Sequence, residues 1–72
     1  MYYDHATIIQ VISSKFKGRL TVHTKSDYVT ETDECLSEYN GLRWYKAKIK
    51  LKQLGYNIKV IGVDVNGKLS MY

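Results

Sequence analysis

The chain has 72 residues, so we expect residues 1–72 to form one small domain. Its 44% hydrophobic and 25% charged residues are ordinary for a globular protein and exclude a wholly disordered chain. The formal net charge is +4, and no apolar run approaches the roughly 18 residues of a membrane span, so we expect no membrane contact.

A single cysteine and the first residues of the chain bear on its compartment. Cys35 has no partner for an internal disulfide, which suits a reducing compartment, and we expect it to be a small buried apolar residue. The N-terminus has no basic segment followed by an apolar stretch, so a signal peptide is not expected. Both features predict a cytoplasmic protein.

The first predicted element is a β-hairpin. Residues 6–14 are rich in β-branched side chains and predict a strand, residues 15–18 predict a loop, and residues 19–24 predict a second strand. Alternation in the second strand places Leu20, Val22 and Thr24 on one face, and Arg19, Thr21 and His23 on the other.

The middle of the chain, residues 33–54, has two interpretations, and the first is a helix. Its acidic residues come first and its basic residues last, which complements the helix dipole. Gly55 follows where a helix end favours a left-handed residue. The same pattern fits a helix that begins only near Asn40, after a separate short turn. One stripe would form the core face: Leu36, Trp44, Ala47, Leu51 and Leu54.

The second interpretation is a pair of strands. Residues 45–52 alternate strictly between polar and apolar, and Asn40-Gly41 would form a hairpin turn. A helix would leave Leu42, Tyr45 and Ile49 opposite its core stripe, and Gly41 inside a helix costs about 1 kcal/mol relative to alanine. The charge order and the helix stop are independent signals, so we predict the helix and keep the strands as the alternative.

The last predicted element is a second hairpin, with strands over residues 58–65 and 68–72. The Asn66-Gly67 pair between them favours a type I′ turn, because both residues tolerate positive φ. The predicted fold class is therefore α+β, a ββαββ antiparallel sheet with one helix packed on one face. An all-β, SH3-like small barrel is the alternative.

The strand interpretation carries a partial resemblance to a known family. The segments 35–39, 44–49 and 60–65 read CLSEY, WYKAKI and VIGVDV, which resembles the strands of Tudor domains. The resemblance implies an SH3-like barrel that binds a peptide with a methylated side chain in an aromatic cage. Tyr39 and Tyr45 fall near cage positions, while Gly62 and Val65 stand where the family has aromatic residues.

The helix interpretation is similar in size and layout to small phage-encoded proteins that block host or defence machinery, including anti-CRISPR proteins and phage antitoxins. The similarity lies in a short chain rich in lysine and tyrosine, with a hairpin, a helix and a hairpin. It implies a stoichiometric inhibitor of a host or defence complex, located in the host cytoplasm. Fold alone does not fix such a function.

The sequence has no pattern typical of an enzyme or a metalloprotein. His5 and His23 are the only histidines, and neither stands at metal-ligand spacing with another ligand. No glycine-rich phosphate loop is present either. We therefore predict no catalytic residue, no metal site, no cofactor and no enzymatic activity.

The distribution of charge is the most informative feature. Residues 26–38 carry acidic residues and no basic one, whereas residues 43–52 carry basic residues and no acidic one. The basic stretch is interleaved with large apolar groups, which are common anchors of protein interfaces. The predicted partner-binding residues are Arg43, Trp44, Tyr45, Lys46, Lys48, Lys50 and Lys52.

These residues favour a protein partner, and a nucleic acid is the alternative. Lysines suit phosphates more than base edges, so a nucleic acid would be contacted along its backbone. A homodimer is a further expectation, through an edge strand or through the second apolar stripe of the helix.

Overall fold

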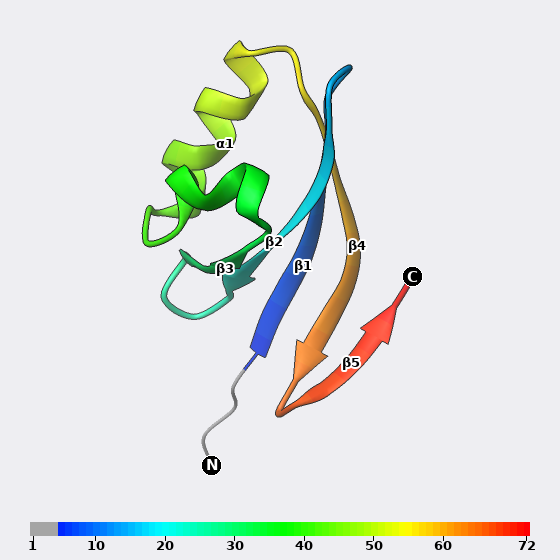
Figure 1. Cartoon of the computed structure of the whole chain (residues 1–72). Helices are drawn as coiled ribbons and strands as arrows, with labels where there is room; N and C mark the ends of the chain where they lie inside the picture. Colours follow the sequence, from blue (N-terminus) through cyan, green and yellow to red (C-terminus); the bar gives the residue numbers. More distant parts are fainter. Residues whose placement is uncertain (1–4) are drawn as a thin grey trace.

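The computed structural model describes residues 5–72. Five antiparallel strands form one sheet in the order β3-β2-β1-β4-β5, and one α-helix and a 3₁₀ helix pack on a single face of it (Figure 1). The elements in chain order are β1 (His5–Ile12), β2 (Lys17–His23), β3 (Tyr28–Thr32), the 3₁₀ helix η1 (Glu34–Tyr39), α1 (Trp44–Gln53), β4 (Asn57–Val65) and β5 (Lys68–Met71).

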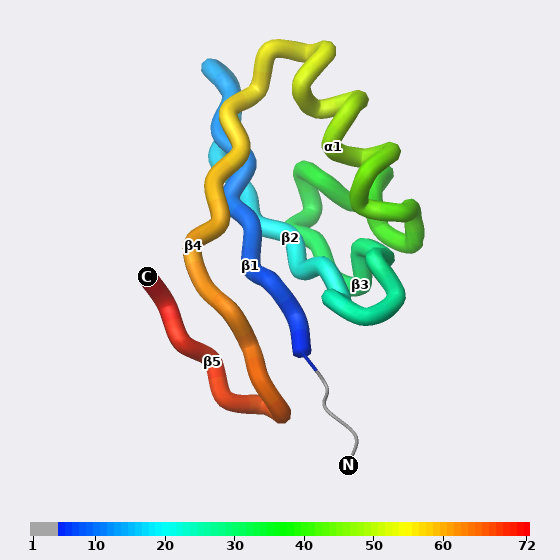
Figure 2. The backbone as a smooth tube through the Cα atoms, turned by 180° about the vertical axis from the view of Figure 1, so that it is seen from behind, coloured from blue at the N-terminus to red at the C-terminus, as the bar shows by residue number. Residues whose placement is uncertain are grey.

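This arrangement confirms the predicted α+β class with a helix on one face. The SH3-like barrel is wrong, because the segment that alternates in sequence is the α-helix Trp44–Gln53. The strands that the Tudor resemblance implied over residues 35–39 and 44–49 are therefore absent. Viewed from behind, the sheet still lies to one side of the helical layer, and β5 forms the edge remote from β3 (Figure 2).

The first hairpin is confirmed, and its faces are as predicted for residues 19–23, whereas Thr24 lies beyond β2 in the following turn and is exposed. β1 and β2 pair in a register that sets Ile9 opposite Leu20 and Val11 opposite Gly18. Ile9, Leu20 and their neighbour Val22 are buried. Because side chains alternate along a strand, the intervening Arg19 and Thr21 lie on the open face of the sheet.

One strand, β3, is an addition to the predicted ββαββ order. It is short, and of its side chains only that of Val29 is buried. It pairs with β2 through a register shift between Thr21 and Val22, and the turn before it contains Asp27 with a φ of 60°. The acidic and threonine-rich strand at the sheet edge carries too little apolar signal to be predicted.

The helical segment splits in two, as the later start near Asn40 allowed. Asn40 is extended and Gly41 has a φ of 85°, so η1 ends before α1 begins. The acidic residues Glu34 and Glu38 lie in η1, so they do not complement the dipole of α1 as the sequence pattern predicted. The order of charges reflects two helices in succession.

The C-terminus of α1 confirms the predicted stop. The N–H of Tyr56 donates to the carbonyl of Leu51 at 3.1 Å, and the N–H of Gly55 donates to that of Lys52 at 3.0 Å. Gly55 has a φ of 79°. These features form a Schellman motif, which satisfies carbonyls left free at a helix end.

The core confirms most of the predicted stripe. Leu36, Ala47 and Leu51 are buried, and Trp44 packs against them while half-buried. Leu54 is exposed instead, because it caps α1 beyond the last full turn. Among residues 5–72, the buried hydrophobic residues are Ile9, Val11, Leu20, Val22, Val29, Leu36, Tyr39, Ala47 and Leu51.

The burial predicted for Cys35 is wrong, because this residue is exposed. It lies at the start of η1, one position before the buried Leu36. A Cβ built on Gly18 of β2 would stand 2.6 Å from the Cys35 Sγ atom. The thiol therefore lies against the β2 backbone at the rim of the core.

The C-terminal hairpin is confirmed with its turn. Asn66 and Gly67 have φ values of 54° and 84°, as a type I′ turn requires, and the Asp64 Oδ1 atom accepts a hydrogen bond from the N–H of Gly67 at 3.0 Å. Gly62 lies opposite Met71, whose Sδ atom would be 2.7 Å from a Cβ at this position. The missing side chain lets β5 approach β4 closely.

Candidate functional site

The helix α1 has a buried face and an exposed apolar face. Ala47 and Leu51 point into the core and are fully buried. On the opposite side, Tyr45 and Ile49 are 51% and 53% exposed. These two residues are four positions apart, so their side chains are neighbours on the helix surface. The structure thus places a continuous apolar ridge on the outside of α1.

Lysines border this ridge on both sides. At 100° per residue, Lys48 and Lys52 lie on one flank, and Lys46 and Lys50 lie on the other. All four are exposed. The sequence has no acidic residue from position 39 to position 63, so no carboxylate on α1 itself balances them. We call Tyr45, Ile49 and these four lysines the outer face of α1.

The charges on α1 are only partly explained by helix stability. Lys50 and Lys52 in the last turn suit the negative end of the helix dipole. The first turn has no acidic residue, and Lys46 near its start meets the positive end, which is unfavourable. The N-cap residue Arg43 makes no side-chain capping bond. Helix stability therefore does not account for the basic residues at the N-terminal end of α1.

Backbone contacts with β3 fix the position of the α1 N-terminus. The N–H of Trp44 donates to the carbonyl of Asp27 at 2.7 Å, and the N–H of Val29 donates to the carbonyl of Leu42 at 2.8 Å. The start of α1 is thus attached to the sheet by backbone hydrogen bonds, in addition to the core contacts of Ala47 and Leu51.

The structure separates the seven residues predicted to bind a partner. Tyr45 and the four lysines lie together on the outer face. Trp44 packs against the core, and Arg43 holds its guanidinium 5.1 Å from the centroid of the Tyr28 ring. The predicted set does not include Ile49, although its position opposite the core stripe predicts that its side chain is exposed. Leu54, 58% exposed at the end of the helix, was assigned to the core instead.

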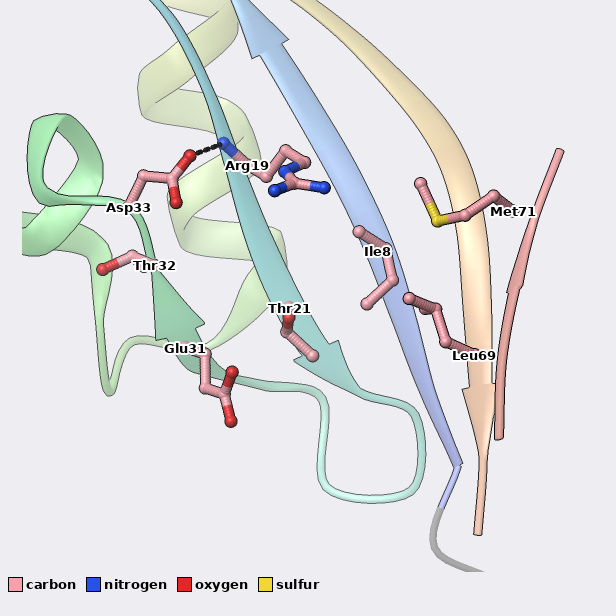
Figure 3. Close-up of a pocket in the computed structure, with 8 residues that line it drawn as sticks. All are labelled: Ile8, Arg19, Thr21, Glu31, Thr32, Asp33, Leu69 and Met71. Atoms are coloured by element: carbon pink, nitrogen blue, oxygen red, sulfur yellow. Dashed lines mark hydrogen bonds between the residues drawn. The ribbon is translucent and has the colours of Figure 1, made fainter. Parts of the chain in front are cut away.

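The open face of the sheet carries a shallow groove (Figure 3). Leu69 and Met71 reach over Ile8 from β5, and Glu31 and Asp33 lie on the opposite side. The Asp33 Oδ2 atom accepts a hydrogen bond from the backbone N–H of Arg19 at 2.9 Å. The groove has a volume of about 200 Å³, below the roughly 300–1,000 Å³ of typical small-molecule sites. A second hollow on the same face has a volume of about 460 Å³ and shares four lining residues with the groove, Ile8, Thr21, Glu31 and Leu69. We treat both hollows as weaker candidates than the outer face of α1.

No three histidine, cysteine, aspartate or glutamate side chains in residues 5–72 come together as metal ligands. His23 uses its Nδ1 atom in a hydrogen bond with the Ser26 hydroxyl at 3.1 Å. Burial, and secondarily the Glu38 carboxylate, raise the pKa of the Tyr39 phenol above its ordinary value of 10.0.

Within residues 5–72, no helix has the length and apolar character needed to cross a bilayer. Comparison of the chain with family models, with curated proteins and with solved structures gives no significant match.

Proposed function

We propose that this chain is a non-enzymatic protein-binding module that recognises an acidic protein surface through the outer face of α1. The observation that carries the proposal is the exposed pair Tyr45 and Ile49, bordered by four lysines with no acidic residue on the helix. The apolar pair would fill a pocket or groove of the partner, and the lysines would face its carboxylates.

The physical chemistry of interfaces supports this division of roles. Apolar residues at the centre of an interface contribute most of the binding energy, and tyrosine is enriched among such residues. Charged residues at the rim mainly accelerate association and select partners of opposite charge. Tyr45 and Ile49 have the position of the centre, and Lys46, Lys48 and Lys50 have that of the rim. An amphipathic helix that lies in an apolar groove is a recurrent mode of recognition.

A nucleic acid is the second candidate partner, favoured by the absence of acidic residues on α1. Contacts would then be made to phosphates, with little preference for sequence. The ridge of Tyr45 and Ile49 divides the lysines into two rows, which suits an acidic protein groove better than one continuous phosphate backbone. Three to five phosphate contacts predict a log–log salt slope of roughly −3 to −4.5 on duplex DNA.

The test compares four versions of the tagged protein as bait in lysate of the cells that naturally produce it: the wild type, a variant without the apolar ridge, a variant with altered α1 charge, and a charge control. Tyr45→Ala/Ile49→Ala removes the apolar ridge, and alanine preserves the helix. The wild type should retain a protein that this variant loses. A second variant, Lys46→Glu/Lys50→Glu, has a control of equal charge change in Lys15→Glu/Lys17→Glu, which alters exposed residues around the β1–β2 turn. Only the α1 charge variant should slow association with the retained protein.

The same variants separate the two partner classes. Purified wild type titrated with fluorescent duplex and single-stranded DNA should show negligible binding, and Lys46→Glu/Lys50→Glu should not change this result. Tight, salt-dependent DNA binding that is lost in the α1 charge variant but not in the Lys15→Glu/Lys17→Glu control would replace the protein partner with a nucleic acid. The inhibitor role suggested by size and layout stays a prediction, and so does the cytoplasmic location. Both become testable once the partner is identified.

A further inference from the structure

The two edges of the sheet differ in how they are closed. At the β3 edge, the N–H of Val29 donates to the carbonyl of Leu42, and the N–H of Gly41 donates to the carbonyl of Val29, both at 2.8 Å. The segment before α1 therefore occupies this edge. At the other edge, no part of residues 5–72 pairs with the outer side of β5.

The hydrogen-bond pattern identifies which groups of β5 point outward. The N–H of Tyr72 donates to the carbonyl of Ile61 at 2.8 Å, across the pair β4–β5. Inward and outward groups alternate along an antiparallel strand, so Ser70 and Lys68 also face β4. The N–H and C=O groups of Leu69 and Met71 consequently point away from the sheet, where another strand can bind them.

The side chains of the same two residues are apolar and exposed. Leu69 and Met71 are 59% and 49% exposed, and both lie on the open face of the sheet (Figure 3). The β4–β5 pairing has no register shift, and the chain has no proline to interrupt it. Natural sheets usually protect such edges with charges, bulges or proline, and Lys68 is the only charged residue on β5.

We propose that β5 is a dimerisation strand that pairs antiparallel with β5 of a second copy of this chain. A twofold axis between the two Ser70 residues would set Leu69 opposite Met71 of the second copy, in the register where outward groups bond to each other. Lys68 would lie opposite Tyr72 of the second copy, so no like charges meet across the pair. This self-complementarity of hydrogen bonds, apolar side chains and charge is what selects a second copy as the occupant.

The proposed symmetry has a consequence for partner binding. A twofold axis normal to the sheet leaves both α1 helices on the same side of a continuous ten-stranded sheet. The dimer would present two outer faces to one target surface, and linked sites of this kind increase avidity. This consequence rests on the proposed function of α1, whereas dimerisation itself does not and can be measured on the purified protein alone.

The test is the molar mass of the purified full chain over a range of concentration, measured by sedimentation equilibrium. Wild type should shift from monomer to dimer as concentration rises. Leu69→Pro removes an outward N–H without touching the bonds to β4, and proline is tolerated on an edge strand in this position. It should weaken dimerisation at least tenfold. Leu69→Ala, which keeps the N–H, should weaken it less.

Amide hydrogen exchange gives a second readout that does not depend on any variant. In wild type, the N–H groups of Leu69 and Met71 should become protected as concentration rises, while that of Ser70 is protected throughout by β4. A monomer at every concentration, with rapid exchange at Leu69 and Met71, would overturn the proposal. So would a dimer in which these two amides stay unprotected, because another surface would then form the contact.

Discussion

Arg43 and Tyr28 are joined both through their backbones and through their side chains. They form an isolated antiparallel bridge, and the Arg43 guanidinium carbon lies 5.1 Å from the centroid of the Tyr28 ring. Tyr28 begins β3, and Arg43 is the N-cap of α1. The contact therefore connects the edge of the sheet to the start of the helix that carries the proposed binding surface.

A double-mutant cycle should measure this contact as a modest stabilisation. We expect Arg43→Ala and Tyr28→Leu to be coupled by about 0.5–1 kcal/mol, the range for a cation over an aromatic ring at an exposed site. The free energies of unfolding of the wild type, both single variants and the double variant, from urea titrations, give the coupling. The backbone bridge is unaffected by either substitution. A coupling near zero would mean that only the backbone holds the two residues together.

The contact between Gly18 and Cys35 predicts a rescue experiment. Gly18→Ala would place its Cβ 2.6 Å from the Cys35 Sγ atom and 3.2 Å from Leu36 Cδ1, so we expect a loss of about 1–3 kcal/mol from overpacking. Cys35→Ala removes the sulfur atom and should restore most of that loss in the double variant. Thermal and urea unfolding measure both effects. Equal destabilisation of Gly18→Ala in the two backgrounds would contradict the proposed crowding.

The raised pKa of Tyr39 predicts a loss of stability in alkali. The folded protein holds the phenol proton more tightly than the unfolded chain, because burial and Glu38 disfavour the phenolate. The stabilisation is complete below pH 10.0, the ordinary pKa, and declines as the pH rises above it. Urea unfolding at pH 9 and pH 11 should show this decline in wild type. In Tyr39→Phe the loss of stability between pH 9 and pH 11 should be smaller. An equal loss in the variant and the wild type would mean that groups other than Tyr39 cause it.

The sequence predicts the parts of the fold in which a short segment contains its own signals. Asn66-Gly67 predicts the second hairpin, and the Gly55 stop predicts the end of α1. β3 lacks such a signal, because Val29 is its only buried residue and its pairing depends on the distant segment before α1. The position of Cys35 likewise depends on how η1 docks on β2, which a periodic pattern does not encode.

The candidate site was predictable to the extent that it follows from helical periodicity. Tyr45 and Ile49 fall opposite Ala47 and Leu51 on any α-helix through this segment, so their exposure follows from the burial of the core stripe. The role of Trp44 could not be assigned in the same way. Its place on the core stripe predicts burial, whereas its large aromatic side chain also suits a partner interface. In the structure Trp44 packs against the core.

A residue-level prediction for the outer face of α1 is that the apolar centre dominates affinity for the captured protein. Tyr45→Ala should weaken binding by about 1–2 kcal/mol or more, and any single lysine to alanine substitution should weaken it less. The lysine variants should instead lower the association rate, with an effect that fades at high salt. Surface plasmon resonance at two ionic strengths separates these quantities. A larger equilibrium effect from a single lysine would contradict the assignment of Tyr45 to the centre.

Site-specific photo-crosslinking can show whether the outer face of α1 touches the partner, because the crosslink reports which residue is in contact. A photoreactive phenylalanine analogue placed at position 49 should crosslink to one discrete protein in lysate of the producing cells. The same analogue at position 15, on the β1–β2 turn, should not. If Tyr45 and Ile49 form the centre of the interface, the crosslink at position 49 should disappear when Tyr45 is changed to alanine. A crosslink to that protein from position 15 with none from position 49 would contradict an interface at the outer face of α1.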